Sequence, residues 1–148
     1  MQVLSRTEQQ EKIMQIMSSF LVCQKEGLVL NVEETIEDVI GVDYSNVPIY
    51  VKEVLIKALK HQNEIILDIS KYLKNWTFSR LNTCIQAILI IAYTNYYYIK
   101  DDNMNKAIII NIAIELAKKY AEKDEYKFVN GILENCLKEE NKSEWWIS

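Results

Sequence analysis

The sequence predicts an all-α protein. Three glycines and one proline among 148 residues leave few positions suited to the tight turns of a β-sheet. Leu, Ala, Lys and Glu, which favour helices, occur throughout, and apolar residues recur at helical spacing in one segment after another. The length fits a single helical domain, which we expect over residues 1–137, followed by a polar tail over 138–148 that ends in Trp-Trp-Ile.

Two N-terminal helices are predicted from their capping residues. Ser5 followed by Glu8 has the spacing of a capping box, and the helix that begins there should end near Lys25 to Gly27. Asn31 repeats the cap, and residues 32–40 then form a short helix with an acidic outer face.

Pro48 suits the first position of one long helix that extends to Leu73. His61 lies in its polar part and is expected to be a surface residue rather than a ligand or a base. Four lysines on the outer face allow two interpretations, a stripe that follows phosphates or a solvated face of mixed charge. We favour the second, because acidic residues share the face with Lys57, Lys60, Lys71 and Lys74.

The C-terminal half contains three further helices. Ser79 is the predicted N-cap of a helix that is apolar on nearly every side between Ala87 and Ala92, and such a helix belongs at the centre of a bundle. After a polar turn over 100–105, two amphipathic helices fill residues 107–137. The short charged connector at 122–124 should make them pack antiparallel.

The composition favours a binding protein over an enzyme. The chain has one His, no Gly-rich phosphate loop and no nucleophile motif. We expect no cofactor and no metal, because the sixth position of a calcium loop starting at Asp101 is Lys106 rather than glycine. The cysteines at 23, 84 and 136 have no metal or redox spacing and are predicted to be reduced core thiols.

Charge and hydropathy limit the possible partners. The net charge is −4 and no segment is strongly basic, so a function in RNA binding would require help from another protein. The N-terminus lacks an apolar signal core, and the longest apolar run is about half the length needed to span a bilayer. A cytoplasmic location without membrane contact is expected.

One set of residues resembles a known family. The chain has Trp76 and Arg80-Leu81, then Ile88-Leu89 and Ile91-Ala92, then Ile110-Asn111, then Ala113-Ile114-Glu115-Leu116-Ala117-Lys118, and finally Lys127-Phe128-Val129-Asn130-Gly131-Ile132-Leu133. This pattern resembles the signature of the NusB family of bacterial transcription antitermination factors. The resemblance covers about the C-terminal half of the chain.

The resemblance implies a fold of two antiparallel three-helix subdomains with six to seven helices and no catalytic activity. It implies a role in transcription antitermination or termination within the RNA polymerase complex. The expected partners are the ribosomal protein NusE and single-stranded RNA of the boxA type.

Two departures from the family pattern bear on function. The arginine-rich run that usually opens the first helix is reduced here to Arg6, and Glu8 follows it. Positions where the family tends to have ionic residues are Ile85, Ile90 and Ile112. Packed aliphatic residues have either replaced a polar network, or they alter a partner surface.

The candidate RNA-binding residues are Arg6, Lys123, Tyr126, Lys127 and Phe128, which combine cations with rings on which unpaired bases can stack. Phe128 also has a core interpretation, since it is in phase with neighbouring apolar residues. A structural role is open for Asn130 and Gly131, because a small residue permits close helix approach. No partner-binding residues are identified.

Three functional hypotheses therefore stand. The first is a NusB-type factor that binds RNA and NusE, and the second is a protein-only helical adaptor that has lost RNA binding. The third comes from NusB-like domains fused to ribosomal RNA methyltransferases, and it would require catalysis by a separate subunit. The sequence leaves open whether Trp145-Trp146 folds back onto the bundle.

Overall fold

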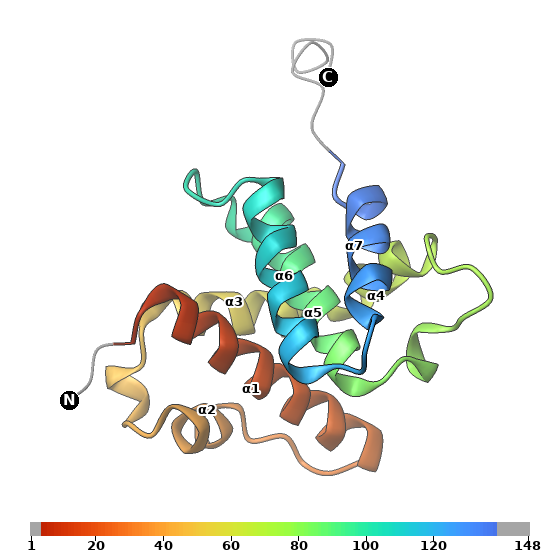
Figure 1. Ribbon diagram of the computed structural model, residues 1–148. Coiled ribbons are helices and arrows are strands. Elements are labelled where there is room, and N and C mark those ends of the chain that lie inside the picture. The colour runs from red at the N-terminus through yellow and green to blue at the C-terminus, as the bar shows by residue number, and fades with distance from the viewer. Residues whose placement is uncertain (1–3, 139–148) are drawn as a thin grey trace, which may run out of the picture.

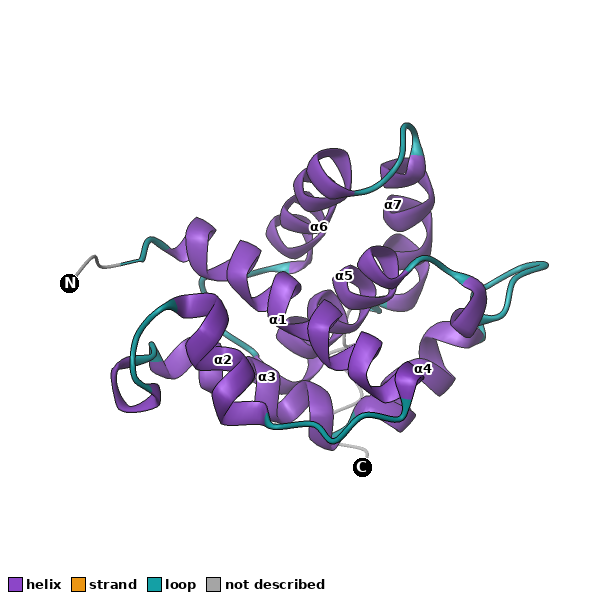
Figure 2. Ribbon diagram, turned by 90° about the horizontal axis from the view of Figure 1, so that it is seen from below, coloured by secondary structure: helices purple, strands orange, loops and turns teal. Residues whose placement is uncertain are grey.

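The computed structural model describes residues 4–138, and over this range it consists of helices and loops (Figures 1 and 2). The prediction of an all-α fold is confirmed. The tail over 139–148, with Trp145-Trp146, lies outside the described residues. The elements are α1 (Arg6–Glu26), α2 (Val32–Ile40), the 3-10 helix η1 (Tyr44–Asn46), α3 (Ile49–Lys60), α4 (Gln62–Ser70), the 3-10 helix η2 (Phe78–Arg80), α5 (Thr83–Thr94), the π-helix η3 (Asn95–Ile99), α6 (Lys106–Tyr120) and α7 (Glu125–Cys136).

The first two helices begin at the predicted caps. The Glu8 amide donates to the Ser5 hydroxyl at 3.1 Å, and the Ser5 amide donates to the Glu8 carboxylate at 3.2 Å. The Asn31 side chain accepts from the amide of Glu34 at 3.0 Å. Gly27 ends α1 with φ +70°, a conformation that glycine adopts without steric cost.

The prediction of one helix from Pro48 to Leu73 is wrong. His61 separates α3 from α4 with φ −105° and ψ 12°, outside the helical range. Its ring stacks flat on that of Tyr98 in η3, with the ring centres 4.1 Å apart. This contact joins residues far apart in the sequence, so helical periodicity alone does not reveal it.

The predicted N-cap of the next helix is also wrong. Ser79 lies inside η2, and Asn82 caps α5 by accepting from the Ile85 amide at 2.8 Å. Either residue is a chemically suitable cap. The 3-10 turn at 78–80 shifts the start of the helix past Leu81.

Helix α5 lies at the centre of the fold (Figure 1). Every residue from Ala87 to Thr94 is buried, and α5 contacts α1, α3, α4, α6 and α7. The prediction of a central helix is therefore confirmed. Ile85 and Ile90 are 1% and 0% exposed, which supports the interpretation that packed aliphatics replace a polar network at these two positions.

Helices α6 and α7 pack side by side, as predicted. The Lys106 ammonium at the start of α6 donates to the Glu134 backbone carbonyl near the end of α7 at 2.9 Å, which fixes their antiparallel order. Of the three free cysteines, Cys136 is buried and the other two are half-buried. Within residues 4–138, no helix combines the length and apolar character needed to cross a bilayer.

Candidate nucleic-acid interface

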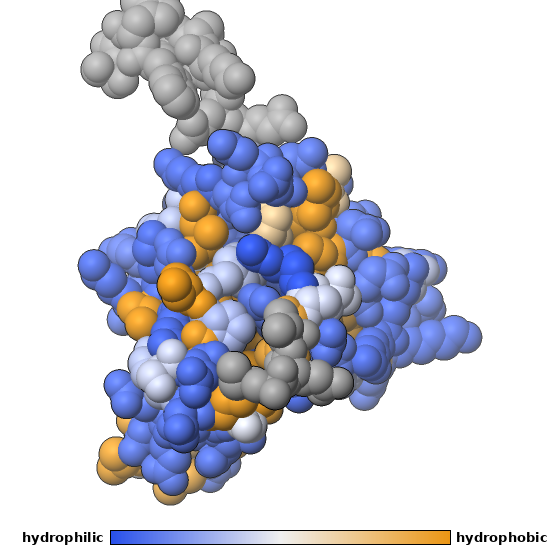
Figure 3. All heavy atoms as spheres, turned by 90° about the vertical axis from the view of Figure 1, so that its left-hand side faces the viewer, coloured by the Kyte–Doolittle hydropathy of each residue, from blue (hydrophilic) through white to orange (hydrophobic). Residues whose placement is uncertain are grey.

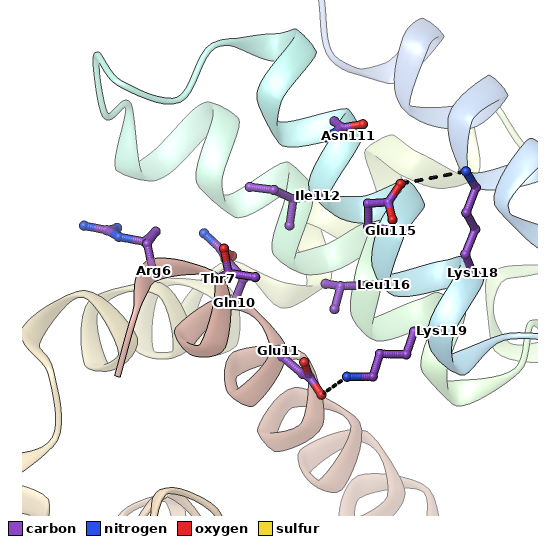
Figure 4. Close-up of a pocket in the computed structure, with 10 residues that line it drawn as sticks. All are labelled: Arg6, Thr7, Gln10, Glu11, Asn111, Ile112, Glu115, Leu116, Lys118 and Lys119. Atoms are coloured by element: carbon purple, nitrogen blue, oxygen red, sulfur yellow. Dashed lines mark hydrogen bonds and ion pairs between the residues drawn. The ribbon is translucent and has the colours of Figure 1, made fainter. Parts of the chain in front are cut away.

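A groove of about 530 Å³ separates the first turns of α1 from the outer face of α6 (Figure 4). In Figure 4, side chains from the two helices face each other, and Arg6 and Lys118 lie at opposite ends. The lining residues are Arg6, Thr7, Gln10 and Glu11 from α1, and Asn111, Ile112, Glu115, Leu116, Lys118 and Lys119 from α6.

Helical spacing explains this lining. Arg6 and Gln10 are one turn apart on α1, as are Asn111 and Glu115 on α6, so each pair shares a face. Between them lies Ile112, which is half-buried. Ile112 therefore lines this candidate binding surface, whereas Ile85 and Ile90 are buried in the core.

The groove contains three cations and two carboxylates, an excess of one positive charge. Lys119 pairs with Glu11 across the groove at 2.9 Å, and Lys118 pairs with Glu115 along α6 at 3.8 Å. Hydrogen bonds from Tyr120 and Lys119 hold the pKa of the Glu11 carboxyl below its ordinary value, so Glu11 is ionised at neutral pH.

Two of the five predicted RNA-binding residues, Arg6 and Tyr126, belong to cation–ring pairs at the ends of this groove. Arg6 lines one end, and its guanidinium carbon lies 3.8 Å from the centre of the Tyr50 ring. At the other end, the Lys118 ammonium lies 4.9 Å from the centre of the Tyr126 ring. Cations and rings are therefore paired at both ends.

Of the five predicted residues, only Arg6 is part of the groove lining, and Tyr126 contacts the groove through Lys118. Lys123 is exposed on the connector, and Lys127 pairs with Asp124 at 3.7 Å. Phe128 is half-buried and packs against the core, which supports its core interpretation. A Cβ built on Gly131 meets no atom within 4 Å, so close helix approach does not require this glycine.

Apart from Arg6 and Ile112, sequence reasoning assigned none of the groove residues to a binding surface. Those it missed are Thr7, Gln10, Glu11, Asn111, Glu115, Leu116, Lys118 and Lys119. Most of these residues lie on the polar faces of α1 and α6, and the helical periodicity of the sequence does indicate those faces. Which two faces meet depends on tertiary packing, and that information is absent from either helix alone.

The side of the molecule on which the chain begins has both hydrophobic and hydrophilic side chains at its surface. Hydrophobic side chains form separate patches among hydrophilic ones (Figure 3). A protein-docking surface usually presents a larger continuous apolar area. The apolar patches visible on this face are interrupted by hydrophilic side chains.

Comparison with known proteins identifies the relatives of this chain. A sequence profile described as the NusB family matches residues 6–138. A protein named transcription antitermination protein NusB from Macrococcus caseolyticus is 30% identical over 91% of this chain and 98% of its own length. A protein of the same name from Clostridium kluyveri is 39% identical over 66% of this chain.

Solved structures share the fold. A structure described as T. maritima NusB has a TM-score of 0.79 at 22% identity and covers 99% of this chain and 100% of that chain. A structure described as antitermination factors NusB and NusE in complex with dsRNA has a TM-score of 0.69 at 22% identity, covering 90% of this chain and 98% of that chain.

The extent of these matches differs among the relatives. The aligned region spans 62% of the Clostridium kluyveri protein, and it spans 66% and 65% of two further relatives that are 43% and 37% identical. The profile, by contrast, matches almost all of the described residues. On this evidence, the chain belongs to the NusB family.

Proposed function

We propose that this protein acts in transcription antitermination or termination by binding boxA-type single-stranded RNA together with ribosomal protein NusE. Its place is within the RNA polymerase complex in the cytoplasm, and it works by non-covalent binding without catalysis. Its family membership supports this proposal, as do relatives named for antitermination and a similarly folded NusB that was solved with NusE and dsRNA.

The observation that carries the proposal is the groove between α1 and α6. Arg6, Lys118 and Lys119 bring three cations to one concave surface. Arg6 and Lys118, at its two ends, lie over the rings of Tyr50 and Tyr126, which are not part of the groove lining. Cations gathered along a groove in this way contact the phosphates of single-stranded RNA.

The charge of the groove explains the need for a partner. Two carboxylates offset two of its three cations, so few counterions are released when RNA binds. We expect weak binding of RNA by this chain alone and tighter binding when NusE adds contacts. Lys123, Lys127 and Phe128 remain proposed contacts beyond the groove.

One observation favours the second candidate function, a protein-only adaptor. Both lysines of the groove already pair with carboxylates, and Ile112 makes part of the lining apolar. In that case NusE or another protein would bind here, and RNA would add nothing to the affinity.

Fluorescence anisotropy distinguishes the two. Labelled boxA RNA, a scrambled RNA and the DNA version are titrated with the protein, with and without NusE from the same bacterium. The proposal expects a preference for boxA RNA and a marked gain with NusE. Binding with neither preference nor gain would overturn the RNA function, and NusE binding that ignores RNA would establish the adaptor.

A further inference from the structure

Arg6, the cation at one end of the groove, lies against a ring that is itself hydrogen-bonded to two buried side chains. Arg6 lies over the Tyr50 ring at 3.8 Å. The Tyr50 hydroxyl donates to the Asn95 side-chain oxygen at 2.5 Å and accepts from the Gln10 amide nitrogen at 2.6 Å. Gln10 and Asn95 are only 2% and 4% exposed, so both ends of this hydrogen-bonded chain are anchored in the core.

The two hydrogen bonds of the Tyr50 hydroxyl connect three elements that are distant in the sequence. Gln10 belongs to α1, Tyr50 to the first turn of α3, and Asn95 opens the π-helix η3. Burial raises the pKa of the Tyr50 phenol, which keeps the hydroxyl protonated and able to donate. The ring is therefore fixed in place before any ligand arrives.

A ring holds a cation without neutralising it. Lys118 and Lys119 both pair with carboxylates, whereas Arg6 forms no ion pair within residues 4–138. A guanidinium that keeps its full charge and has a fixed position suits the bidentate contact that arginine makes with a phosphate. Less side-chain freedom is then lost on binding.

We propose that Tyr50 is a positioning residue for RNA binding, which holds Arg6 where the RNA backbone enters the groove. This role rests on the proposed function above. Tyr50 acts through Arg6, and Gln10 and Asn95 act through Tyr50. Removing the ring therefore removes the benefit of the guanidinium.

A double-mutant cycle tests this assignment. Binding of labelled boxA RNA in the presence of NusE is measured for the parent, Arg6→Gln, Tyr50→Leu and the double variant over a range of salt concentrations. Each single change should weaken binding about 3- to 10-fold and reduce the salt slope by roughly 0.7, the value for one phosphate contact on a single strand. The double variant should be no weaker than Arg6→Gln alone.

Matched variants separate positioning from general damage. Tyr44 offers a similar ring outside the groove, where the Lys52 ammonium lies 4.3 Å from the ring centre. Tyr44→Leu removes this ring and should leave RNA binding unchanged. If Tyr50→Leu fails to fold, Tyr50→Phe keeps the ring but frees it from Gln10 and Asn95, and should still lower both affinity and salt slope.

The outcomes are distinct. Additive losses, an unchanged salt slope, or Tyr50 variants that bind like the parent would overturn the positioning role while leaving RNA binding intact. A parent protein that binds no RNA even with NusE would overturn the proposed function itself, and the role of Tyr50 with it.

Discussion

The Glu11 carboxylate on α1 accepts a hydrogen bond from the Lys119 ammonium on α6 at 2.9 Å, and the Tyr120 hydroxyl donates to the same carboxylate. The contact links residues 108 positions apart and closes one side of the groove. It also gives Lys119 an internal anion, which a phosphate of bound RNA would have to replace or share.

Glu11→Gln should therefore tighten RNA binding. The substitution leaves the groove with three cations and one carboxylate, so affinity for boxA RNA should rise several-fold and its salt dependence should steepen by roughly 0.7. Anisotropy titrations at several salt concentrations measure both. Glu115→Gln is the control, since Lys118 and Glu115 are more widely separated and on one helix. Equal effects of the two variants would mean that only net charge matters.

The same carboxylate should contribute a pH-dependent stability. Its pKa in the folded protein lies below the ordinary 4.5, because Tyr120 and Lys119 hydrogen-bond to the ionised form. The contribution is present above the ordinary value and is lost as pH falls through the lower, folded value. Thermal unfolding of parent and Glu11→Gln should differ at neutral pH and converge in acid. A difference that grows on acidification would contradict this.

Asn82→Ala should destabilise the protein by about 1 kcal/mol, the usual cost of losing an N-cap. The Asn82 side chain accepts from the Ile85 amide and also donates to the Glu125 carboxylate at 2.9 Å, so it secures the starts of both α5 and α7. Urea unfolding measures the loss. Ser79→Ala is the matched control and should have little effect, whereas the reverse ranking would restore Ser79 as the cap.

Gly131→Ala should stabilise the protein by about 0.5–1 kcal/mol, because alanine is the better residue inside a helix. Nothing lies within 4 Å of a Cβ at this position in α7. Gly27→Ala provides the contrast, since φ +70° there makes alanine cost roughly 1 kcal/mol. Chemical denaturation of both variants gives the comparison, and a destabilised Gly131→Ala would reveal a constraint on α7 absent from its packing.

Local signals in the sequence predicted most of the fold. The caps at Ser5 and Asn31 and the apolar run over 87–92 depend only on neighbouring residues, and each appears in the structure as expected. The failures have a different origin. The break at His61 accompanies a stacking contact with Tyr98, and the cap shifted from Ser79 to Asn82 because a 3-10 turn intervenes.

The candidate site was harder to predict for the same reason. Arg6 and Tyr126 were identified from residue type, and each belongs to a cation–ring pair at one end of the groove. The partners, Tyr50 and Lys118, come from other elements, and no local pattern links them. Phe128 was ambiguous because stacking residues and core residues share the same chemistry, and only its burial separates them.

The central position of α5 has a consequence for the life of the protein in the cell. Helices from both the beginning and the end of the chain pack on it, so a local defect exposes apolar side chains along the whole polypeptide. Quality-control proteases act on such exposed segments, and a loss of 1–2 kcal/mol is enough to change abundance several-fold. Substitutions in α5 should therefore reduce activity by accelerating turnover, even though the proposed RNA-binding residues remain unchanged.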